Sequence, residues 1–128
     1  MKHLITNGID HINLMVINLE ETCLFWETLM GFKTLEEIPE EKGRIIGNKK
    51  ALLALYEIPG MKRYKKNGFS HFSFQIENFN NIEPKIKEMG LKLKYNKVFQ
   101  WKNSRSIYIE DPNGYEIELA EKWGGGLV

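Results

Sequence analysis

Gly8-Ile9-Asp10-His11 and Gly68-Phe69-Ser70-His71 are two versions of one motif, 60 residues apart. A stretch with helical character follows each motif and ends in a similar way, at Met30-Gly31-Phe32-Lys33 in the first half and at Met89-Gly90-Leu91-Lys92 in the second. A repeat at a nearly constant offset is typical of two copies of one supersecondary unit. We therefore expect His11 and His71 to occupy equivalent positions on equivalent strands.

Periodicity and turn signals predict the same order of elements in each half, namely a strand, a helix and then three strands. The first repeat, residues 8–58, is expected to contain a strand over 8–17, a helix over 19–30 and strands over 32–38, 43–48 and 50–58. The second repeat, residues 68–121, is expected to contain a strand over 70–77, a helix over 78–89 and strands over 91–100, 105–111 and 115–121. The stretch of about 59–67, which begins with Pro59-Gly60 and leads into the turn signal Asn67-Gly68, is the predicted linker.

Three local signals mark the ends of these elements. Asn18 with Glu21 three residues later is typical of a capping box, and Gly31 is a helix stop signal. Asp111-Pro112-Asn113-Gly114 predicts a tight hairpin turn, in which Asn113 and Gly114 would supply positive φ angles.

Length and composition indicate a single globular domain. With 128 residues, 42% of them hydrophobic and 27% charged, the chain can fill one core and is too short for two independent domains. We therefore expect one domain over residues 1–128.

Charge and cysteine content limit the partners and the compartment. The net charge of +1 argues against a nucleic acid or a membrane as the main partner. The basic run Lys62, Arg63, Lys65 and Lys66 is interpreted as a solvated loop. A single cysteine fits a reducing compartment. Since the chain has no signal peptide and no apolar run of spanning length, a cytoplasmic location is the default expectation.

Strand alternation indicates which side chains share a polar face. In the first strand His11 and Asn13 oppose an apolar set, and in its counterpart His71 does the same. In the last strand Glu116 and Glu118 lie opposite Ile117 and Leu119. His11, His71 and Glu118 are therefore expected near one level of the polar faces.

Two imidazoles and one carboxylate are a ligand set for a divalent metal. Such a triad leaves open positions on iron, nickel, zinc, manganese or cobalt, where a substrate can bind. Each strand histidine taken singly has an alternative role as a hydrogen-bonded structural residue, and Glu116 with Glu118 could form a solvated edge. The placement of both histidines at one position of a repeat favours the metal site.

The chain resembles the vicinal oxygen chelate superfamily, which includes glyoxalase I, extradiol dioxygenases and the fosfomycin and bleomycin resistance proteins. The resemblance covers residues 8–121 and depends on His11, on the motif that ends at His71 and on the closing sequence Ser106 to Leu119. It implies an α+β fold of paired βαβββ units, whose mixed sheets form an open, curled cup with the helices outside. It also implies that His11, His71 and Glu118 bind a divalent metal, which would chelate two neighbouring oxygens of a small-molecule substrate.

Differences between this sequence and individual members of the superfamily help to separate the possible reactions. The internal symmetry places Ala54 opposite Glu118, so the fourth carboxylate ligand usual in glyoxalase I is absent. Fosfomycin-modifying relatives have a segment similar to Arg105-Ser106-Ile107-Tyr108 but also a cationic tail that this chain lacks. Extradiol dioxygenases generally have a further catalytic histidine, and bleomycin-type binding proteins usually lack the ligands. We expect a glyoxalase-type lyase or isomerase that acts on an oxygenated or electrophilic metabolite, with a dioxygenase, a fosfomycin-resistance-like transferase and a non-catalytic binding protein as alternatives.

The remaining site residues are inferred from strand parity and from loops. Glu118 and Tyr108 are the candidate catalytic residues. The candidate substrate-binding residues are Asn13, Tyr56, Trp101 and Arg105. For the aromatic residues the alternative is core or rim packing, and for Arg105 it is a surface ion pair. An open cup leaves sheet edges and apolar surface uncovered, so a homodimer is expected.

Overall fold

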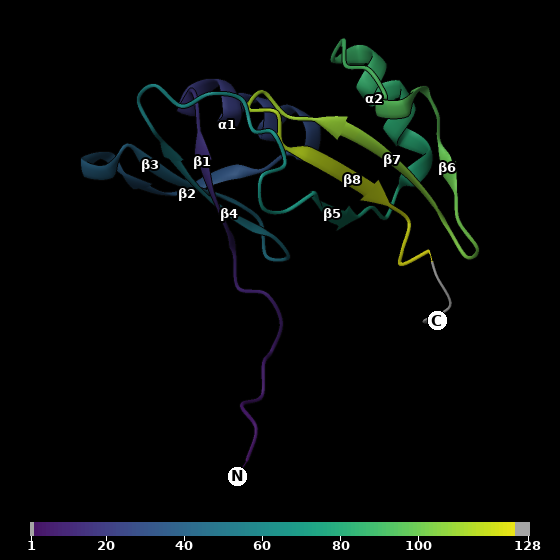
Figure 1. Ribbon diagram of the computed structural model, residues 1–128, viewed down its shortest axis with the longest axis horizontal. Helices are drawn as coiled ribbons and strands as arrows, with labels where there is room; N and C mark the ends of the chain where they lie inside the picture. The colour runs from purple at the N-terminus through teal and green to yellow at the C-terminus, as the bar shows by residue number, and fades with distance from the viewer. Residues whose placement is uncertain (1, 125–128) are drawn as a thin grey trace. The chain divides into compact units, whose positions relative to one another are not determined.

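The structure is a computed structural model that describes residues 2–124. The chain divides into two compact units, one up to residue 61 and one from residue 62 onward (Figure 1). Each unit contains a four-stranded mixed sheet and one α-helix, which confirms the predicted α+β class with paired βαβββ units. Within the described residues no helix is long and apolar enough to cross a membrane.

The first unit follows the predicted order of elements closely. Its elements are β1 (Ile12–Val16), α1 (Leu19–Met30), β2 (Lys33–Ile38), the 3-10 turn η1 (Pro39–Glu41), β3 (Gly43–Gly47) and β4 (Leu52–Glu57). The strand order is β1-β4-β3-β2, with β1 parallel to β4 and the other neighbours antiparallel. The connection from β1 to β2 runs through α1 (Figure 1).

Both ends of α1 agree with the capping signals in the sequence. The Asn18 side-chain oxygen accepts a hydrogen bond from the Glu21 backbone N–H at 2.8 Å, which satisfies one free donor of the first turn. Gly31 follows the last turn with φ at 69°, and its N–H donates to the Glu27 carbonyl at 2.8 Å. A left-handed residue at this position favours glycine, which has no Cβ to strain.

The core of the first unit lies between α1 and one face of its sheet. Trp26 and Phe25 are buried on the helix, and Leu14 and Val16 are buried on β1, whereas Asn13 on the other face of β1 is exposed. This burial pattern matches the predicted alternation, because successive residues of a strand point to opposite faces.

The second unit repeats the topology of the first. Its elements are β5 (His71–Gln75), the 3-10 turn η2 (Phe79–Asn81), α2 (Ile82–Glu88), the 3-10 turn η3 (Lys94–Asn96), β6 (Phe99–Gln100), β7 (Arg105–Glu110) and β8 (Glu116–Ala120). The strand order β5-β8-β7-β6 is the equivalent of β1-β4-β3-β2, again with one parallel pair. Asn13 pairs with Ala54 in the first unit as Ser73 pairs with Glu118 in the second. Ala54 is therefore the counterpart of Glu118, as the sequence symmetry predicted.

Three details of the second unit differ from the prediction. The helix expected over 78–89 begins as a 3-10 turn and is α-helical only over Ile82–Glu88. The strand expected over 91–100 is wrong for most of its length, because Tyr95 and Asn96 adopt left-handed angles and only Phe99–Gln100 pairs with β7. In the turn before β8, only Gly114 has a positive φ, at 88°. The loop is shaped instead by the carboxylate of Asp111.

Asp111 organises this turn through its side chain. Its Oδ1 accepts the backbone N–H groups of Asn113 and Tyr115, both at 2.9 Å, and its Oδ2 accepts the Asn113 side-chain amide at 2.9 Å. Asp111 and Asn113 are both buried. Aspartate commonly stabilises turns in this way, because its short carboxylate reaches backbone donors two residues further along the chain.

Candidate metal centre

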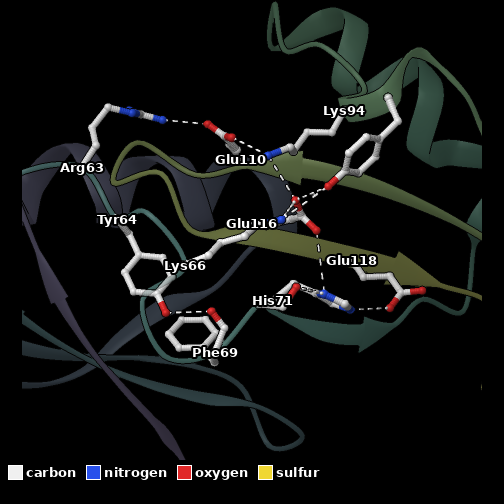
Figure 2. Close-up of polar contacts among 11 residues, drawn as sticks. Arg63, Tyr64, Lys66, Phe69, His71, Lys94, Glu110, Glu116 and Glu118 are labelled. Atoms are coloured by element: carbon white, nitrogen blue, oxygen red, sulfur yellow. Dashed lines mark hydrogen bonds and ion pairs between the residues drawn. The ribbon is translucent and has the colours of Figure 1, made fainter.

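The polar face of the second sheet brings together two of the three predicted metal ligands. His71 begins β5 and Glu118 lies in the middle of β8, with the His71 Nε2 atom 3.2 Å from the Glu118 Oε1 atom (Figure 2). Tyr108 on β7 pairs with Glu118 across the antiparallel ladder, so its side chain lies on the same face. These three side chains are close together because β8 lies between β5 and β7.

The separation of His71 and Glu118 suits two neighbouring ligands of one ion. Imidazole nitrogens and carboxylate oxygens bind zinc at roughly 2.1 Å, so two ligands lie about 3.0 Å apart at an octahedral angle and about 3.4 Å apart at a tetrahedral one. The observed 3.2 Å between Nε2 and Oε1 lies between these values. Among residues 2–124 no group of three or more histidine, cysteine or acidic side chains gathers within one metal-binding arrangement. The second unit therefore offers a pair of donors, to which a third would have to be added.

His11, the third predicted ligand, lies in the first unit. It immediately precedes β1, and its side chain is about half exposed. Its Nδ1 atom is 2.7 Å from the Asp10 Oδ2 atom, a contact that leaves Nε2 as the nitrogen available to bind a metal ion. In His71, by contrast, both ring nitrogens lie near side chains, Nδ1 near Ser70 Oγ at 3.1 Å and Nε2 near Glu118.

Tyr108 lies against both members of the donor pair. Its ring meets the His71 ring edge-on, with the ring centres 5.3 Å apart. Burial, and next the negative charge of Glu118, raise the pKa of Tyr108 to about 12. The phenol is therefore neutral near pH 7, and it can donate a proton in a hydrogen bond beside Glu118.

Glu116 is a buried carboxylate next to His71. Its Oε1 atom accepts from Lys66 at 2.8 Å, from Tyr95 at 2.7 Å and from Lys94 at 3.1 Å, while Oε2 lies 3.7 Å from the His71 Nδ1 atom (Figure 2). Burial alone would raise the pKa of Glu116. Hydrogen bonds from Lys66, Tyr95 and Lys94 outweigh that effect and lower the pKa to about 2. Glu116 is therefore ionised throughout the physiological range.

Glu110 extends this charged network along β7. It lies opposite Glu116 in the ladder and binds Lys94 at 2.6 Å and Arg63 at 2.8 Å. The hydrogen bond from Lys94 is the main reason that the pKa of Glu110 is lowered. The result is a row of alternating charges, Arg63, Glu110, Lys94, Glu116 and Lys66, beside the donor pair (Figure 2).

The basic run lies in an exposed loop, as interpreted, and two of its members also form ion pairs. Arg63 and Lys66 are 54% and 41% exposed and pair with Glu110 and Glu116. Strand parity contained the signal that could have identified them. It placed two carboxylates on one polar face, and carboxylates that become buried need cationic partners from elsewhere in the chain.

Tyr64 attaches this loop to the second unit. Its backbone N–H donates to the Asn113 carbonyl at 2.8 Å, and its hydroxyl donates to the Phe69 carbonyl at 2.7 Å. Its ring packs between Phe69 and Tyr115, with centre distances of 4.8 and 4.9 Å. Part of the predicted linker is thus an ordered strap, residues 62–66, that positions Arg63 and Lys66 over the polar face.

Trp101 and Arg105 lie on different faces of the second sheet. The Trp101 indole donates to the Ser106 hydroxyl at 2.7 Å and stacks on Phe99, which in turn contacts Tyr108 with ring centres 5.1 Å apart. Arg105 alternates with Tyr108 to the opposite face, where it binds Glu121 at 2.9 Å and covers the Phe79 ring. Trp101 therefore belongs to the surroundings of the donor pair, whereas the Arg105 guanidinium takes part in a surface ion pair.

Asn13 and Tyr56 lie in the first unit. Asn13 is exposed on β1 beside Ala54 of β4. Tyr56 is partly buried and pairs with Gly43, where a Cβ atom would overlap the Tyr56 ring. The two side chains share the polar face of the first sheet with Ala54, as parity predicted.

Curated proteins similar to this chain include enzymes of two kinds. It is 25% identical over 126 residues to the lactoylglutathione lyase of Neisseria meningitidis, covering 90% of this chain and 91% of that protein. It is 23% identical over 118 residues to the glutathione transferase FosA of Serratia marcescens, covering 88% of this chain and 79% of that protein.

Solved structures show the same fold. A mutant of the fosfomycin resistance protein FosX of Listeria monocytogenes, in a complex with Mn(II) and 1S,2S-dihydroxypropylphosphonic acid, superposes with a TM-score of 0.75 at 22% identity, covering 96% of this chain and 94% of that one. A lactoylglutathione lyase of Agrobacterium tumefaciens superposes with a TM-score of 0.73 at 19% identity, covering 93% and 98%.

A family profile matches almost the whole of this chain. The profile aligns with residues 8–119, a range that includes His11, His71 and Glu118. The resemblance inferred from the repeated motif is therefore confirmed, and the chain belongs to the Glyoxalase/Bleomycin resistance protein/Dioxygenase superfamily, the vicinal oxygen chelate proteins.

Proposed function

We propose that this protein is a metal-dependent vicinal oxygen chelate enzyme, a lyase or isomerase of the glyoxalase type that acts on a small oxygenated or electrophilic molecule. Its metal would be held by His11, His71 and Glu118 and would be iron, nickel, zinc, manganese or cobalt. The observation that carries this proposal is the 3.2 Å separation between His71 Nε2 and Glu118 Oε1 on one polar face. The lactoylglutathione lyases among its relatives support the reaction class.

The roles of the other side chains follow from their placement. The bound ion would polarise two neighbouring substrate oxygens and stabilise the negative charge that develops there. Tyr108 presents a neutral hydroxyl beside Glu118 and would donate a hydrogen bond to that charge. Glu118 is the candidate base as well as a ligand. Glu116 is unsuited to that role, because its Oε1 atom is held by two lysines and a tyrosine.

Substrate contacts are proposed on both polar faces. Asn13 and Tyr56 would provide them from the first unit and Trp101 from the second, while the ion pair with Glu121 leaves Arg105 a supporting role at the far face. We propose further that the two units form one domain with a shared cup, that the protein is a homodimer, and that it works in the cytoplasm. A light-scattering mass equal to one chain would exclude the homodimer.

Metal binding is the direct test of the ligand assignment. Protein prepared without metal would be titrated with Zn²⁺ and Mn²⁺ by calorimetry, together with Glu118→Gln and with Glu77→Gln as the matched control. Glu77 is an exposed carboxylate just after β5, so its replacement changes the net charge equally. We expect one ion per chain, a loss of affinity of at least about tenfold in Glu118→Gln, and little change in Glu77→Gln. Equal affinities in all three proteins would refute the assignment.

A second candidate reaction is the opening of an epoxide on a small phosphonate. The similarity to FosA and FosX favours it, as does the presence of Lys66 and Lys94 near His71, where cations can attract an anionic substrate. Assays with methylglyoxal plus glutathione and with fosfomycin, each with and without added metal, separate the two reactions. Turnover of the hemithioacetal alone would support the first candidate, and turnover of fosfomycin alone would support the second.

A further inference from the structure

Three aromatic side chains form a wall on one side of the proposed metal centre. Tyr95, Phe99 and Trp101, the aromatic wall, come from the 3-10 turn η3, from β6 and from the residue that follows β6. The Phe99 ring meets the Tyr108 ring edge-on, with centres 5.1 Å apart, and meets the Tyr95 ring edge-on at 5.8 Å. Tyr108 is buried, whereas His71 is 31% exposed. The donor pair is therefore covered on the side of β6.

Trp101 closes one end of the polar face. Ser106, Tyr108 and Glu110 point to this face at successive levels of β7, because every second residue of a strand points to the same side. The Trp101 indole N–H donates to the Ser106 hydroxyl at 2.7 Å, so the ring lies at the level next to that of Tyr108 and Glu118. Ser106 is completely buried, although Trp101 is 40% exposed. The indole therefore separates the Ser106 hydroxyl from a molecule bound at the donor pair.

The indole is held in place by its neighbours. It stacks on the Phe99 ring, with ring centres 5.4 Å apart and 17° between the planes. The backbone at Gly124 also lies against it, since a Cβ atom added there would overlap the Trp101 side chain. The Gly124 carbonyl accepts from the Asn103 N–H at 2.9 Å, which fixes this backbone to the turn after Trp101. Trp101 cannot swing aside without breaking these contacts, so it acts as a fixed barrier.

The other end of the polar face is charged. Glu110, at the last level of β7, pairs with Arg63 and Lys94 (Figure 2). Lys94 and Lys66 also bind Glu116. An apolar group placed on these charges would displace their water, and the burial of charged groups in apolar surroundings costs free energy. An apolar substituent of a bound molecule thus meets the fixed indole in one direction and the ion pairs in the other.

We propose that Trp101 is a specificity-determining residue, which admits molecules with a short aliphatic group beside the two chelated oxygens and excludes molecules with an aromatic ring there. The inference rests on the proposed function in taking His71 and Glu118 as metal ligands. It adds the substrate class, namely small aliphatic carbonyl or hydroxy compounds. Loss of the indole would leave an apolar slot beside the Phe99 ring, in which an aromatic substituent can lie.

Hydroxamates of two sizes test the proposal, because each binds a divalent ion through two neighbouring oxygens. Zn²⁺-loaded wild type and Trp101→Ala would be titrated by calorimetry with acetohydroxamate, which has a methyl group, and with benzohydroxamate, which has a phenyl ring. We expect the wild type to bind acetohydroxamate at least about tenfold more tightly than benzohydroxamate. The ratio of the benzohydroxamate affinity to the acetohydroxamate affinity should rise at least about tenfold in Trp101→Ala.

Trp123→Ala is the matched control. It removes the same side chain from a position after β8 that is 66% exposed. Its affinity ratio should stay within about twofold of the wild-type ratio. An equal rise of the ratio in both variants, or no rise in Trp101→Ala, would overturn the proposal. Binding of benzohydroxamate by the wild type as tightly as acetohydroxamate would overturn it as well.

Trp101→Leu covers the case in which Trp101→Ala does not fold. It keeps an apolar side chain against Phe99 and leaves most of the space of the indole empty, so the affinity ratio should again rise about tenfold. A wild-type ratio in this variant would refute the inference.

Free indole provides a measurement without metal. Metal-free Trp101→Ala should bind indole, whereas the wild type and Trp123→Ala should not, because only the first has an empty slot of that shape. Absence of indole binding to Trp101→Ala would show that Phe99 and Gly124 do not keep this slot open and would overturn the inference. If the wild-type protein takes up no Zn²⁺, the proposed function fails, while the indole titration still decides whether Trp101 fills a slot on the polar face.

Discussion

Replacement of Glu116 by glutamine should lower the free energy of unfolding by an amount that depends on pH. The change removes the negative charge that Lys66, Lys94 and Tyr95 share, and it leaves the shape of the side chain nearly unchanged. The native contacts lower the pKa of Glu116 from 4.5 to about 2. A difference of about 2.5 pKa units corresponds to about 3 kcal/mol of stability at pH 7. Because Lys66 is 41% exposed, water screens its interaction with Glu116, and the calculated stabilisation is therefore an upper limit.

The sign of the pH dependence follows from the direction of this shift. Because the folded-state pKa is the lower one, the contribution is complete above pH 4.5 and is lost as the pH falls toward 2. At pH 3 about 1.4 kcal/mol should remain. Urea denaturation of the metal-free wild type and of Glu116→Gln at pH 7 and pH 3 measures both values, with Glu77→Gln as control. A loss of stability that is the same at both pH values, or no loss at pH 7, would refute the electrostatic reasoning.

Three further substitutions test local features of the fold and the site. Asn18→Ala removes the hydrogen bond to the Glu21 N–H and should lower the free energy of unfolding by about 1 kcal/mol, measured by thermal denaturation, and an unchanged melting temperature would contradict the capping role. Gly47→Ala places a Cβ atom against the Ala51 carbonyl at a φ of 142°, so we expect a loss of more than about 2 kcal/mol in urea denaturation, and wild-type stability would show that the β3–β4 turn can relax. Tyr108→Phe removes the hydroxyl beside Glu118 and should lower kcat about 100-fold for whichever substrate is turned over, while Zn²⁺ affinity stays within about twofold. Unchanged kcat would exclude Tyr108 from the chemistry.

Much of the first unit could be predicted because its signals are local. The helix bounds Leu19–Met30 depend on Asn18 and Gly31, which lie next to the ends that they mark. The equivalence of Ala54 and Glu118 could be read from the repeat, because a two-residue side-chain period keeps register along paired strands. The same period assigns Tyr108 and Glu118 to the polar faces of their strands, and the pairing of β7 with β8 makes these one face.

The segment 91–98 could not be predicted in the same way. Its alternating Leu and Lys residues are typical of a strand, yet Tyr95 and Asn96 adopt φ values of 64° and 55°, which no extended strand allows. The contacts of Lys94 and Tyr95 with Glu116 accompany this local conformation. Tertiary contacts of this kind override the local preference for a strand.

The amino-acid sequence by itself determined the repeat and the strand faces, because alternation and capping act between neighbouring residues. The tertiary structure alone decided which cations reach the buried carboxylate. Lys66 and Lys94 lie 50 and 22 positions before Glu116 and come from a strap and a 3-10 turn, whose side-chain directions follow no sequence period. Lys66 and Tyr95 adopt positive φ angles of 57° and 64°, and a left-handed residue other than glycine leaves no reliable mark in the sequence.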